Sequence, residues 1–490
     1  MVVGAALLRF WAIGHQGFWY DEAVTGWLLR GSPGQLLSAI PRTESTPPLY
    51  YLLDWGWVRV FGDTEAGLRS LSAVFGVVSV PVVFAAAREL VGRRGGLAAA
   101  ALVAVNPLLV WYSQEARAYS LLVLTSAVAF WMFARARTDP TPRRLALWGV
   151  AGAAALCTHY FAVFLLLPEA LWLLGDRRSA LRWRLLAVSI VGVTGLALTG
   201  LALSQRFHAT SWLVSIPLRA RVTQIPRQLL VGFTPPAGHG ALAIAGAAVL
   251  AAVVLIALRA RGRERWGAGL AASVAAAGIV VPVILALAGT DYLNTRNVIA
   301  ALVPLSVALA AVLSASRAGP AGVAALLALV AVSVYLVAGV QGDPGAQRAD
   351  WHRVSAALAR IPGRHAILLD GSASWARTIG FYIPHTWWVP AGGARVSEVD
   401  VVRRLPNHHS CDPENWWGAS CDIGARHRSR RSLVAGFRRV SAQRLSGFAI
   451  ERYVSPRPVR LYVHKPFVSP AGTSQKRKLM LTPTAAPLLP

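Results

Sequence analysis

The sequence predicts an α-helical polytopic membrane protein, with about eleven transmembrane helices followed by a small C-terminal extracytoplasmic α/β domain. The first observation behind this prediction is composition. Of the 490 residues, 55% are hydrophobic and only 14% are charged, whereas soluble domains carry roughly 25% charged residues. The second observation is that long apolar runs recur along the first 340 residues and then stop.

The apolar runs give the predicted helices in order. A spanning helix needs about 20 mostly apolar residues. The first run is shorter than this and contains Arg9. We therefore expect the true start of the protein to lie upstream; the alternative is a short helix whose Arg9 side chain reaches the membrane interface. Glu169 lies inside a later run, where we expect a neighbouring arginine as its partner. The predicted helices cover Met1–Gly14, Ala66–Val91, Gly95–Tyr112, Ala118–Ala134, Leu145–Thr158, Tyr160–Gly175, Leu185–Ser204, Ala241–Leu258, Gly267–Ala288, Val298–Ser314 and Ala321–Val340.

Four short connections between the runs are rich in arginine, and they fall on one side if each run crosses the membrane once. The positive-inside rule makes that side cytoplasmic. This predicts a cytoplasmic N-terminus and an extracytoplasmic C-terminal region in the cell membrane. The same rule, with anionic lipid, explains the net charge of +27, so we expect no nucleic-acid binding. The connections carry Arg93 and Arg94; Arg135, Arg137, Arg143 and Arg144; Arg177, Arg178, Arg182 and Arg184; and Arg259, Arg261, Arg263 and Arg265.

The chain divides into three predicted segments. Residues 1–340 form the transmembrane domain, with a long first outer loop at residues 14–65. Residues 341–467 form the α/β domain, and residues 468–490 form a disordered tail without an apolar period. Within the first outer loop, Pro47 to Trp57 predicts a short amphipathic helix in the membrane interface, with a full span as the alternative.

Local patterns predict the elements of the C-terminal domain. We expect helices at Asp350–Ala359 and Ser372–Tyr382 and a strand at His365–Asp370. A hairpin is expected from Phe448–Tyr453 and Val459–His464, turning around Pro456. A second amphipathic helix is expected earlier in the chain, at Ile216–Leu230.

Two adjacent carboxylates, Asp21 and Glu22, follow the first apolar run in the stretch Phe18 to Thr25. Side chains of adjacent helical residues diverge by about 100°, so the pair serves two roles. One carboxylate faces a substrate hydroxyl, and the other faces a metal, a cation or the fold. The alternative is that both stabilise the start of the following helix, where negative charge is favoured.

Basic and aromatic residues recur at other predicted outer ends of helices. Glu115, Arg117 and Tyr119 follow Asn106-Pro107, and arginine binds phosphate in a bidentate way to which a tyrosine adds a hydrogen bond. His159 marks an outer turn and Arg296 begins a helix, whose amide groups favour anions. The alternatives are a Glu115–Arg117 surface pair, an interfacial histidine and an ordinary loop arginine.

The ordered run of motifs resembles the C-type superfamily of membrane glycosyltransferases, in the bacterial branch akin to protein O-mannosyltransferases and the lipid A aminoarabinose transferase. The resemblance covers about Met1 to Val340. The motifs are Trp19-Tyr20-Asp21-Glu22, Thr46-Pro47-Pro48-Leu49-Tyr50-Tyr51-Leu52-Leu53, Phe61-Gly62-Asp63 with Arg69, Asn106-Pro107 with Tyr112-Ser113-Gln114-Glu115-Ala116-Arg117-Ala118-Tyr119-Ser120, and Thr158-His159-Tyr160.

The resemblance implies a sugar donor linked to polyprenyl phosphate and an acceptor hydroxyl in the cell envelope, on a lipid, a glycan or a protein. It implies Asp21 as the catalytic base, with Glu22 and Glu115 as supporting carboxylates. In that family, basic residues near the outer ends of helices bind the phosphate, and three residues of this sequence lie at comparable places. They are Arg117, His159 and Arg296, with Tyr119 beside them and Tyr50 against the lipid chain or the sugar.

The predicted reaction is an inverting transfer, because attack opposite the leaving phosphate inverts the anomeric centre. Polyprenyl phosphate is a weak base and needs cations rather than a general acid, unlike the leaving group of a glycosidase. Mg²⁺ or Mn²⁺ at Asp21 and Glu22 is compatible with carboxylate chemistry, although other members of this branch do without a metal. The alternative functions are a flippase or transporter of lipid-linked sugar, and a non-catalytic envelope scaffold.

Overall fold

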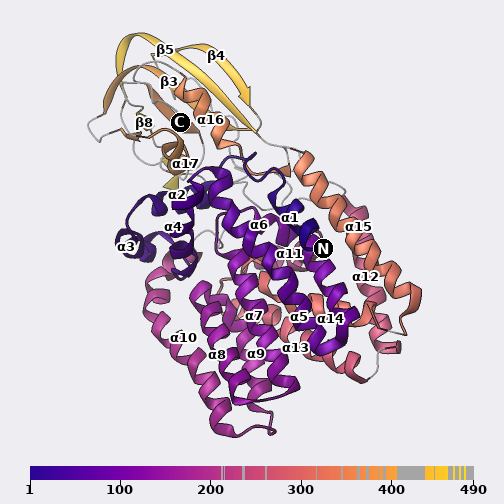
Figure 1. The fold of residues 1–490 in the computed structure, drawn as a ribbon. Coiled ribbons are helices and arrows are strands. Elements are labelled where there is room, and N and C mark those ends of the chain that lie inside the picture. Colours follow the sequence, from indigo (N-terminus) through magenta and orange to yellow (C-terminus); the bar gives the residue numbers. More distant parts are fainter. Residues whose placement is uncertain are drawn as a thin grey trace. The chain divides into compact units, whose positions relative to one another are not determined.

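The computed structural model divides by contacts into two units (Figure 1). Unit 1 comprises Met1–Ile13 and Leu28–Gly342, and unit 2 comprises Gly14–Trp27 and Asp343–Pro490. Gly14–Trp27 therefore groups with the C-terminal segment, where we expected it within the transmembrane domain. The structure describes all residues except 211–212, 214–215, 234–237, 260–261, 316, 344–345, 361–364, 371–374, 385, 390–392, 406–435, 446, 462–466, 469–473, 476–478 and 482–490.

Unit 1 is a helical bundle, and every predicted apolar run coincides with one or more of its helices. The amphipathic helices predicted at Pro47–Trp57 and Ile216–Leu230 are confirmed as α4 and α11. The helices are α1 (Val2–Phe10), α3 (Pro33–Thr43), α4 (Leu49–Phe61), α5 (Glu65–Val105), α6 (Pro107–Ser113), α7 (Tyr119–Thr138), α8 (Pro142–Thr158), α9 (Val163–Leu174), α10 (Leu181–Thr210), α11 (Leu218–Val231), α12 (Gly238–Arg259), α13 (Gly262–Leu287), α14 (Leu302–Leu313) and α15 (Gly319–Gly342), with short 3-10 helices η1 (Tyr160–Ala162) and η3 (Thr295–Ala301).

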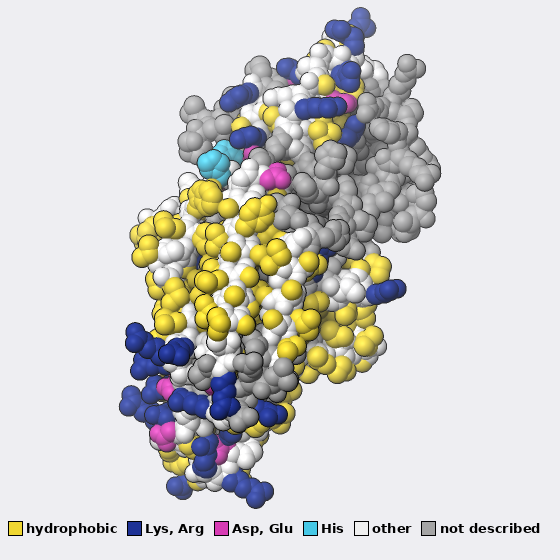
Figure 2. Space-filling model, turned by 90° about the vertical axis from the view of Figure 1, so that its right-hand side faces the viewer, with side chains coloured by type: hydrophobic (Ala, Val, Ile, Leu, Met, Phe, Trp, Pro, Cys, Tyr) yellow, Lys and Arg dark blue, Asp and Glu magenta, His cyan; other side chains and the backbone are white. Residues whose placement is uncertain are grey.

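The multi-pass membrane character of unit 1 is supported by helix length and composition. Among the described residues, six helices are long and apolar enough to cross a membrane. The predicted number of about eleven stays a prediction, since several apolar helices are shorter than a full span. Figure 2 shows a broad face of hydrophobic side chains over the helices, with Lys and Arg gathered at one end. A surface of this kind suits a hydrocarbon core bordered by an anionic interface.

The four arginine-rich connections meet at one end of unit 1, as we expected from the sequence. Arg135 lies 3.7 Å from Glu89, and Arg263 donates to the carbonyls of Glu89 and Leu90 at 2.6 and 3.1 Å. Arg137 pairs with Asp176 at 2.5 Å. These bonds join the turn near Gly92 to the connections that follow α7, α9 and α12. The shared side is observed, and its cytoplasmic location stays a prediction.

Gly92 marks the turn between two of the predicted spans. The long helix α5 contains non-helical geometry at this residue, with φ 85° and ψ 179°. That region of backbone space is essentially restricted to glycine. Gly92 thus separates the runs that we predicted as Ala66–Val91 and Gly95–Tyr112.

We expect Gly92→Ala to lower the free energy of unfolding by about 1–3 kcal/mol, because alanine is strained in this backbone conformation. An added Cβ would meet no atom within 4 Å, so the loss would come from the backbone alone. Gly56→Ala is the control, since Gly56 is exposed inside α4, also with no atom within 4 Å. Helix propensity predicts that the control is stabilised by about 0.5–1 kcal/mol. Thermal unfolding in detergent measures both, and equal shifts would contradict the explanation.

Glu169 corrects one sequence expectation. Its carboxylate accepts a hydrogen bond from the indole of Trp148 at 2.7 Å, rather than pairing with an arginine. Both side chains are buried between α8 and α9. An indole N–H satisfies a buried carboxyl group without adding a second charge to the helix interface.

Unit 2 contains a six-stranded mixed sheet in the order β2-β8-β1-β3-β5-β4. The parallel pair β1 and β3 is connected through α17. Alternating side chains of β1 serve two cores: Ile367 and Leu369 pack toward the core of α16 and α17, while Ala366 and Leu368 face the opposite one. The elements are α16 (Trp351–Ala359), β1 (Ala366–Asp370), α17 (Trp375–Tyr382), β2 (Trp387–Trp388), β3 (Ala394–Arg404), β4 (Arg438–Leu445), β5 (Phe448–Leu461), β6 (Phe467–Val468), β7 (Ser474–Gln475) and β8 (Leu479–Leu481).

Two predictions for this unit are wrong, and those for its helices and first strand hold where the structure describes them, with residues 372–374, 462–464 and 482–490 outside the described part. The expected helices and the first strand are present as α16, α17 and β1. The expected hairpin is instead one strand, β5, which continues through Pro456 and pairs with β3 and β4. Proline is tolerated there because the ladder to β3 skips from Val454 to Val459 and the ladder to β4 ends at Val454. Leu479–Leu481, expected in a disordered tail, forms β8 within the sheet.

Candidate functional site

The turn between α6 and α7 positions three of the predicted site residues. Asn106 starts α6 by accepting a hydrogen bond from the Leu109 amide at 3.1 Å, with Pro107 in the first turn. The short helix ends at Ser113, and the chain turns so that the Arg117 amide donates to the Glu115 carbonyl at 2.8 Å. Tyr119 then begins α7. The side chains of Glu115, Arg117 and Tyr119 are all buried.

Arg117 forms a buried ion pair with Glu44, a residue that the sequence analysis did not single out. The Arg117 Nη1 atom lies 2.6 Å from Glu44 Oε2, and the two side chains are 7% and 1% exposed. The alternative that we considered was a Glu115–Arg117 pair at the surface, whereas both side chains are buried. Glu44 lies two residues before the Thr46-Pro47-Pro48 motif, and this position was the feature of the sequence that could have indicated it as a site residue.

Tyr51 completes the surroundings of Glu44. Its hydroxyl donates to Glu44 Oε2 at 2.5 Å and lies 3.1 Å from the Thr46 hydroxyl. Burial raises the pKa of the Tyr51 phenol well above its usual value, so the phenol stays protonated and remains a donor. The Arg117 guanidinium carbon also lies 5.8 Å from the centre of the Tyr51 ring. Glu44 thus receives both a cation and a neutral donor.

Tyr50 links this group to α5 and to the turn that carries Arg117. Its hydroxyl is 3.0 Å from Ser72 Oγ, and Ser72 in turn donates to the Arg117 carbonyl at 3.4 Å. The ring is fully buried and meets Tyr51 edge-on, with ring centres 5.6 Å apart. Its observed contacts are with the protein, and its predicted contact with lipid or sugar stays a prediction.

Asp54 is a second carboxylate that the sequence analysis missed. It follows Tyr50 by one helical turn on α4 and is fully buried. Burial raises the pKa of its carboxyl well above the usual value, although the nearby Tyr50 phenol opposes that rise. A carboxyl group at such a site is held as the neutral acid. The sequence feature that could have indicated Asp54 is its place as an acidic residue between Leu52-Leu53 and Trp55.

The predicted phosphate-binding residues His159 and Arg296 gather around Tyr119. The Arg296 guanidinium carbon lies 5.8 Å from the centre of the Tyr119 ring, and the centres of the His159 and Tyr119 rings are 5.9 Å apart. Arg296 is held at the start of η3, where its amide donates to the Asn294 side chain at 3.2 Å. Three predicted residues from separate segments are thereby brought together.

His159 is neutral in this environment. Burial, followed by the positive charges of Arg296 and Arg117, lowers the pKa of the His159 imidazole to about 3. Its Nδ1 atom accepts a hydrogen bond from the Phe161 amide at 3.2 Å, so the ring proton is on Nε2. His159 thus offers one neutral N–H donor, and the positive charge of this group comes from Arg117 and Arg296.

Asp21 and Glu22 belong to unit 2, in the first turn of α2 (Tyr20–Arg30). Glu22 is fully buried and accepts from the Trp19 amide at 3.5 Å, which is the helix-start role that we considered for the pair. Asp21 is half-buried. The two carboxylates therefore differ in their surroundings, as expected for adjacent positions on a helix.

The preceding segment is fixed within the same unit. The Phe18 amide donates to the Tyr382 hydroxyl at 2.7 Å, and the Phe18 ring packs against Phe381 with centres 5.1 Å apart. Trp27, one end of this segment, donates from its indole to the Arg377 carbonyl at 3.2 Å. The start of α2 is therefore tied to α17.

Metal binding at Asp21 and Glu22 stays a prediction. Across the part of the chain that the structure describes, no group of three or more His, Cys, Asp or Glu side chains is arranged to hold a metal ion. Two carboxylates hold Mg²⁺ only when water or substrate oxygens complete the octahedral shell.

Residues 45–202 match the profile of the family described as dolichyl-phosphate-mannose-protein mannosyltransferase. The matched range includes Arg117, Tyr119 and His159, and it excludes Asp21 and Arg296. Together with the helical bundle and its polar end, this match confirms the resemblance to the C-type superfamily of membrane glycosyltransferases. No curated protein is significantly similar to the chain in sequence.

The fold of this chain is similar to that of a solved structure. ArnT from Cupriavidus metallidurans bound to undecaprenyl phosphate has a TM-score of 0.52 at 15% identity, over 78% of this chain and 83% of that chain. Weaker matches include the oligosaccharyltransferase AglB from Archaeoglobus fulgidus with an inhibitory peptide and a dolichol-phosphate, at TM-score 0.41 and 14% identity over 74% of this chain and 57% of that one. The S. cerevisiae Pmt1-Pmt2 complex bound to the sugar donor matches at TM-score 0.31 and 18% identity, over 44% and 33%. The chain therefore resembles the fold of ArnT over most of its length.

Proposed function

We propose that this protein is a glycosyltransferase that moves a sugar from a polyprenyl-phosphate donor to a hydroxyl of a cell-envelope acceptor, on the extracytoplasmic face and with inversion. The observation that carries the proposal is the placement of Arg296 and His159 against Tyr119, with Arg117 close enough for its charge to lower the pKa of His159, in a chain whose fold resembles that of ArnT. Two guanidinium groups and a neutral N–H donor match the chemistry of a phosphate that gains charge as it leaves.

Each residue then has a chemical task. Asp21 accepts the proton of the acceptor hydroxyl, and the resulting oxygen nucleophile attacks the anomeric carbon. The bond from that carbon to the phosphate oxygen breaks on the opposite side, so the configuration inverts. Arg117 and Arg296 stabilise the released polyprenyl phosphate, and His159 adds a hydrogen bond from Nε2. No general acid is needed, since a phosphate leaves without being protonated.

The supporting residues act on these groups rather than on the sugar. Glu44 and Tyr51 fix the direction of the Arg117 guanidinium through bonds of 2.6 and 2.5 Å with the Glu44 carboxylate. Glu22 holds the start of α2 by its bond to the Trp19 amide, which leaves Asp21 as the more accessible carboxylate. Glu115 is buried at the turn that carries Arg117.

Deleting the gene in its host tests the reaction. Mass spectrometry should find a sugar-carrying polyprenyl phosphate accumulating and one envelope component lacking that sugar. Purified protein in vesicles should then convert this donor to free polyprenyl phosphate when an envelope extract is supplied. A flippase would instead move the intact donor across the vesicle without cleaving the bond between sugar and phosphate, and that result would contradict the proposal.

A further inference from the structure

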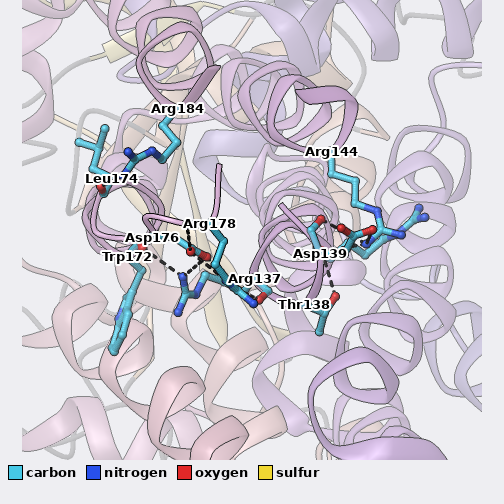
Figure 3. A network of polar contacts seen from close by, with 10 residues as sticks. Arg137, Thr138, Asp139, Arg144, Trp172, Leu174, Asp176, Arg178 and Arg184 are labelled. Carbon is cyan, nitrogen blue, oxygen red and sulfur yellow. Dashed lines mark hydrogen bonds and ion pairs between the residues drawn. The ribbon is translucent and has the colours of Figure 1, made fainter. Parts of the chain in front are cut away.

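A second polar cluster lies at the arginine-rich end of unit 1, away from the group around Tyr119. Arg137 is next to last on α7 and Tyr119 is first, so the helix rise of 1.5 Å per residue separates them by about 27 Å. Figure 3 shows Arg137, Asp176 and Arg178 pointing toward one another from α7 and the connection after α9. Asp176 accepts from both guanidinium groups, at 2.5 Å each.

This cluster retains positive charge after its internal pairing. The Asp176 carboxylate forms ion pairs with both Arg137 and Arg178, while Asp139 acts on Arg178 by charge but does not line the cleft. Arg177 adds a third guanidinium to the lining. Three guanidinium groups against one carboxylate leave a net charge of +2 among the lining residues. The Arg137 side chain is only 12% exposed, and its Nε–H has no acceptor among the described residues. The cluster is therefore suited to an additional anion.

An open cleft of about 640 Å³ borders the cluster. Its other wall is apolar and comes from α9, with Pro168, Leu171 and Trp172 lining it. Leu171 is 62% exposed and Leu167, one turn earlier, is 50% exposed, so this wall continues along the hydrophobic surface of α9. The cleft thus has a cationic end and an apolar side that extends toward the lipid-facing surface.

Two indole rings lie at this boundary. The Arg137 guanidinium carbon is 5.5 Å from the centre of the Trp172 ring and 6.0 Å from that of Trp266. Tryptophan is enriched where the hydrocarbon core meets the headgroups. We therefore expect the arginines of the cleft to lie at the depth of lipid phosphates.

We propose that this cleft binds an anionic phospholipid, with the headgroup phosphate at Arg177 and Arg178 and an acyl chain along Leu171 and Trp172. The charge excess favours an anionic headgroup over a zwitterionic one. The apolar wall favours a lipid over a soluble phosphate, which would leave that wall without a partner. The lipid would join α7, α9 and α13 at their arginine-rich ends.

Native mass spectrometry of the delipidated full-length protein tests this site, with phosphatidylglycerol and phosphatidylcholine as probes. Phosphatidylglycerol should be retained and phosphatidylcholine lost. Arg177→Gln should reduce retention of phosphatidylglycerol about fivefold, the effect of one arginine near an anionic headgroup. Arg177 is exposed, so this variant should unfold thermally at the wild-type temperature.

Arg143→Gln is the matched control, because Arg143 is also exposed at this end of unit 1 and does not line the cleft. It removes the same charge and should leave retention unchanged. Equal losses in the two variants, equal retention of both lipids, or full displacement by soluble glycerol phosphate would each overturn the proposal. The binding measurement needs no sugar donor, so its outcome is independent of the proposed transfer reaction.

Discussion

Asp21→Asn is expected to lower the rate of sugar transfer by about 10²–10⁴-fold, the usual contribution of a positioned general base. An amide has the shape of the carboxylate but does not accept the hydroxyl proton. Because Asp21 is half-buried and in the first turn of α2, the substitution should leave expression, membrane insertion and thermal unfolding close to those of the wild type. The measurement is release of polyprenyl phosphate from the donor.

Glu22→Gln is the control for this experiment. The Glu22 side chain accepts from the Trp19 amide at 3.5 Å, and a glutamine oxygen can accept the same bond. We expect a smaller loss of activity than for Asp21→Asn. Near-normal transfer by the Asp21 variant would remove this residue as the base, and a larger loss in the Glu22 variant would transfer the role to its neighbour.

Arg117→Gln is expected to lower the free energy of unfolding by about 3–5 kcal/mol, because it leaves the Glu44 carboxylate buried without its cation. The two side chains are 7% and 1% exposed, so water cannot replace the lost partner. The double variant Arg117→Gln with Glu44→Gln should recover part of this loss, which thermal unfolding in a double-mutant cycle measures. The exposed pair Arg30–Asp63 is the control, and Arg30→Gln should cost about 1 kcal/mol or less.

Donor kinetics separate the structural role of Arg117 from phosphate binding. If Arg117 also contacts the donor phosphate, its substitution raises the KM for the donor, while Glu44→Gln keeps the cation and leaves that KM unchanged or lower. Equal changes in KM for both variants would restrict Arg117 to holding the fold. Arg296 would then remain as the cation of the group around Tyr119.

The sequence was most informative where one pattern determines one structure. Apolar runs and arginine-rich connections predicted the helices of unit 1 and their shared end, because bilayer thickness and charge bias act on every membrane segment. The Thr158-His159 motif correctly indicated a helix end, whereas the predicted helix Gly95–Tyr112 is interrupted at Asn106, between α5 and α6. Gly92 was harder to recognise, since a positive φ is visible only in the backbone.

Contacts between distant segments were beyond local patterns. Glu44 and Arg117 are 73 positions apart, and nothing near either residue identifies the other as its partner. Glu169 was expected to meet an arginine, but helix packing presented Trp148. In unit 2, Pro456 suggested a turn, although the strand continues where its pairing is interrupted.

Strand β8 has a consequence for the order in which the molecule is completed. Leu479–Leu481 pairs with β1 on one side and β2 on the other, yet it comes about a hundred residues after them in the chain. Until synthesis has passed that point, β1 keeps a row of unpaired amides and carbonyls open to incorrect strand pairing or proteolysis. The sheet can therefore be completed only after Leu479–Leu481 have been synthesised.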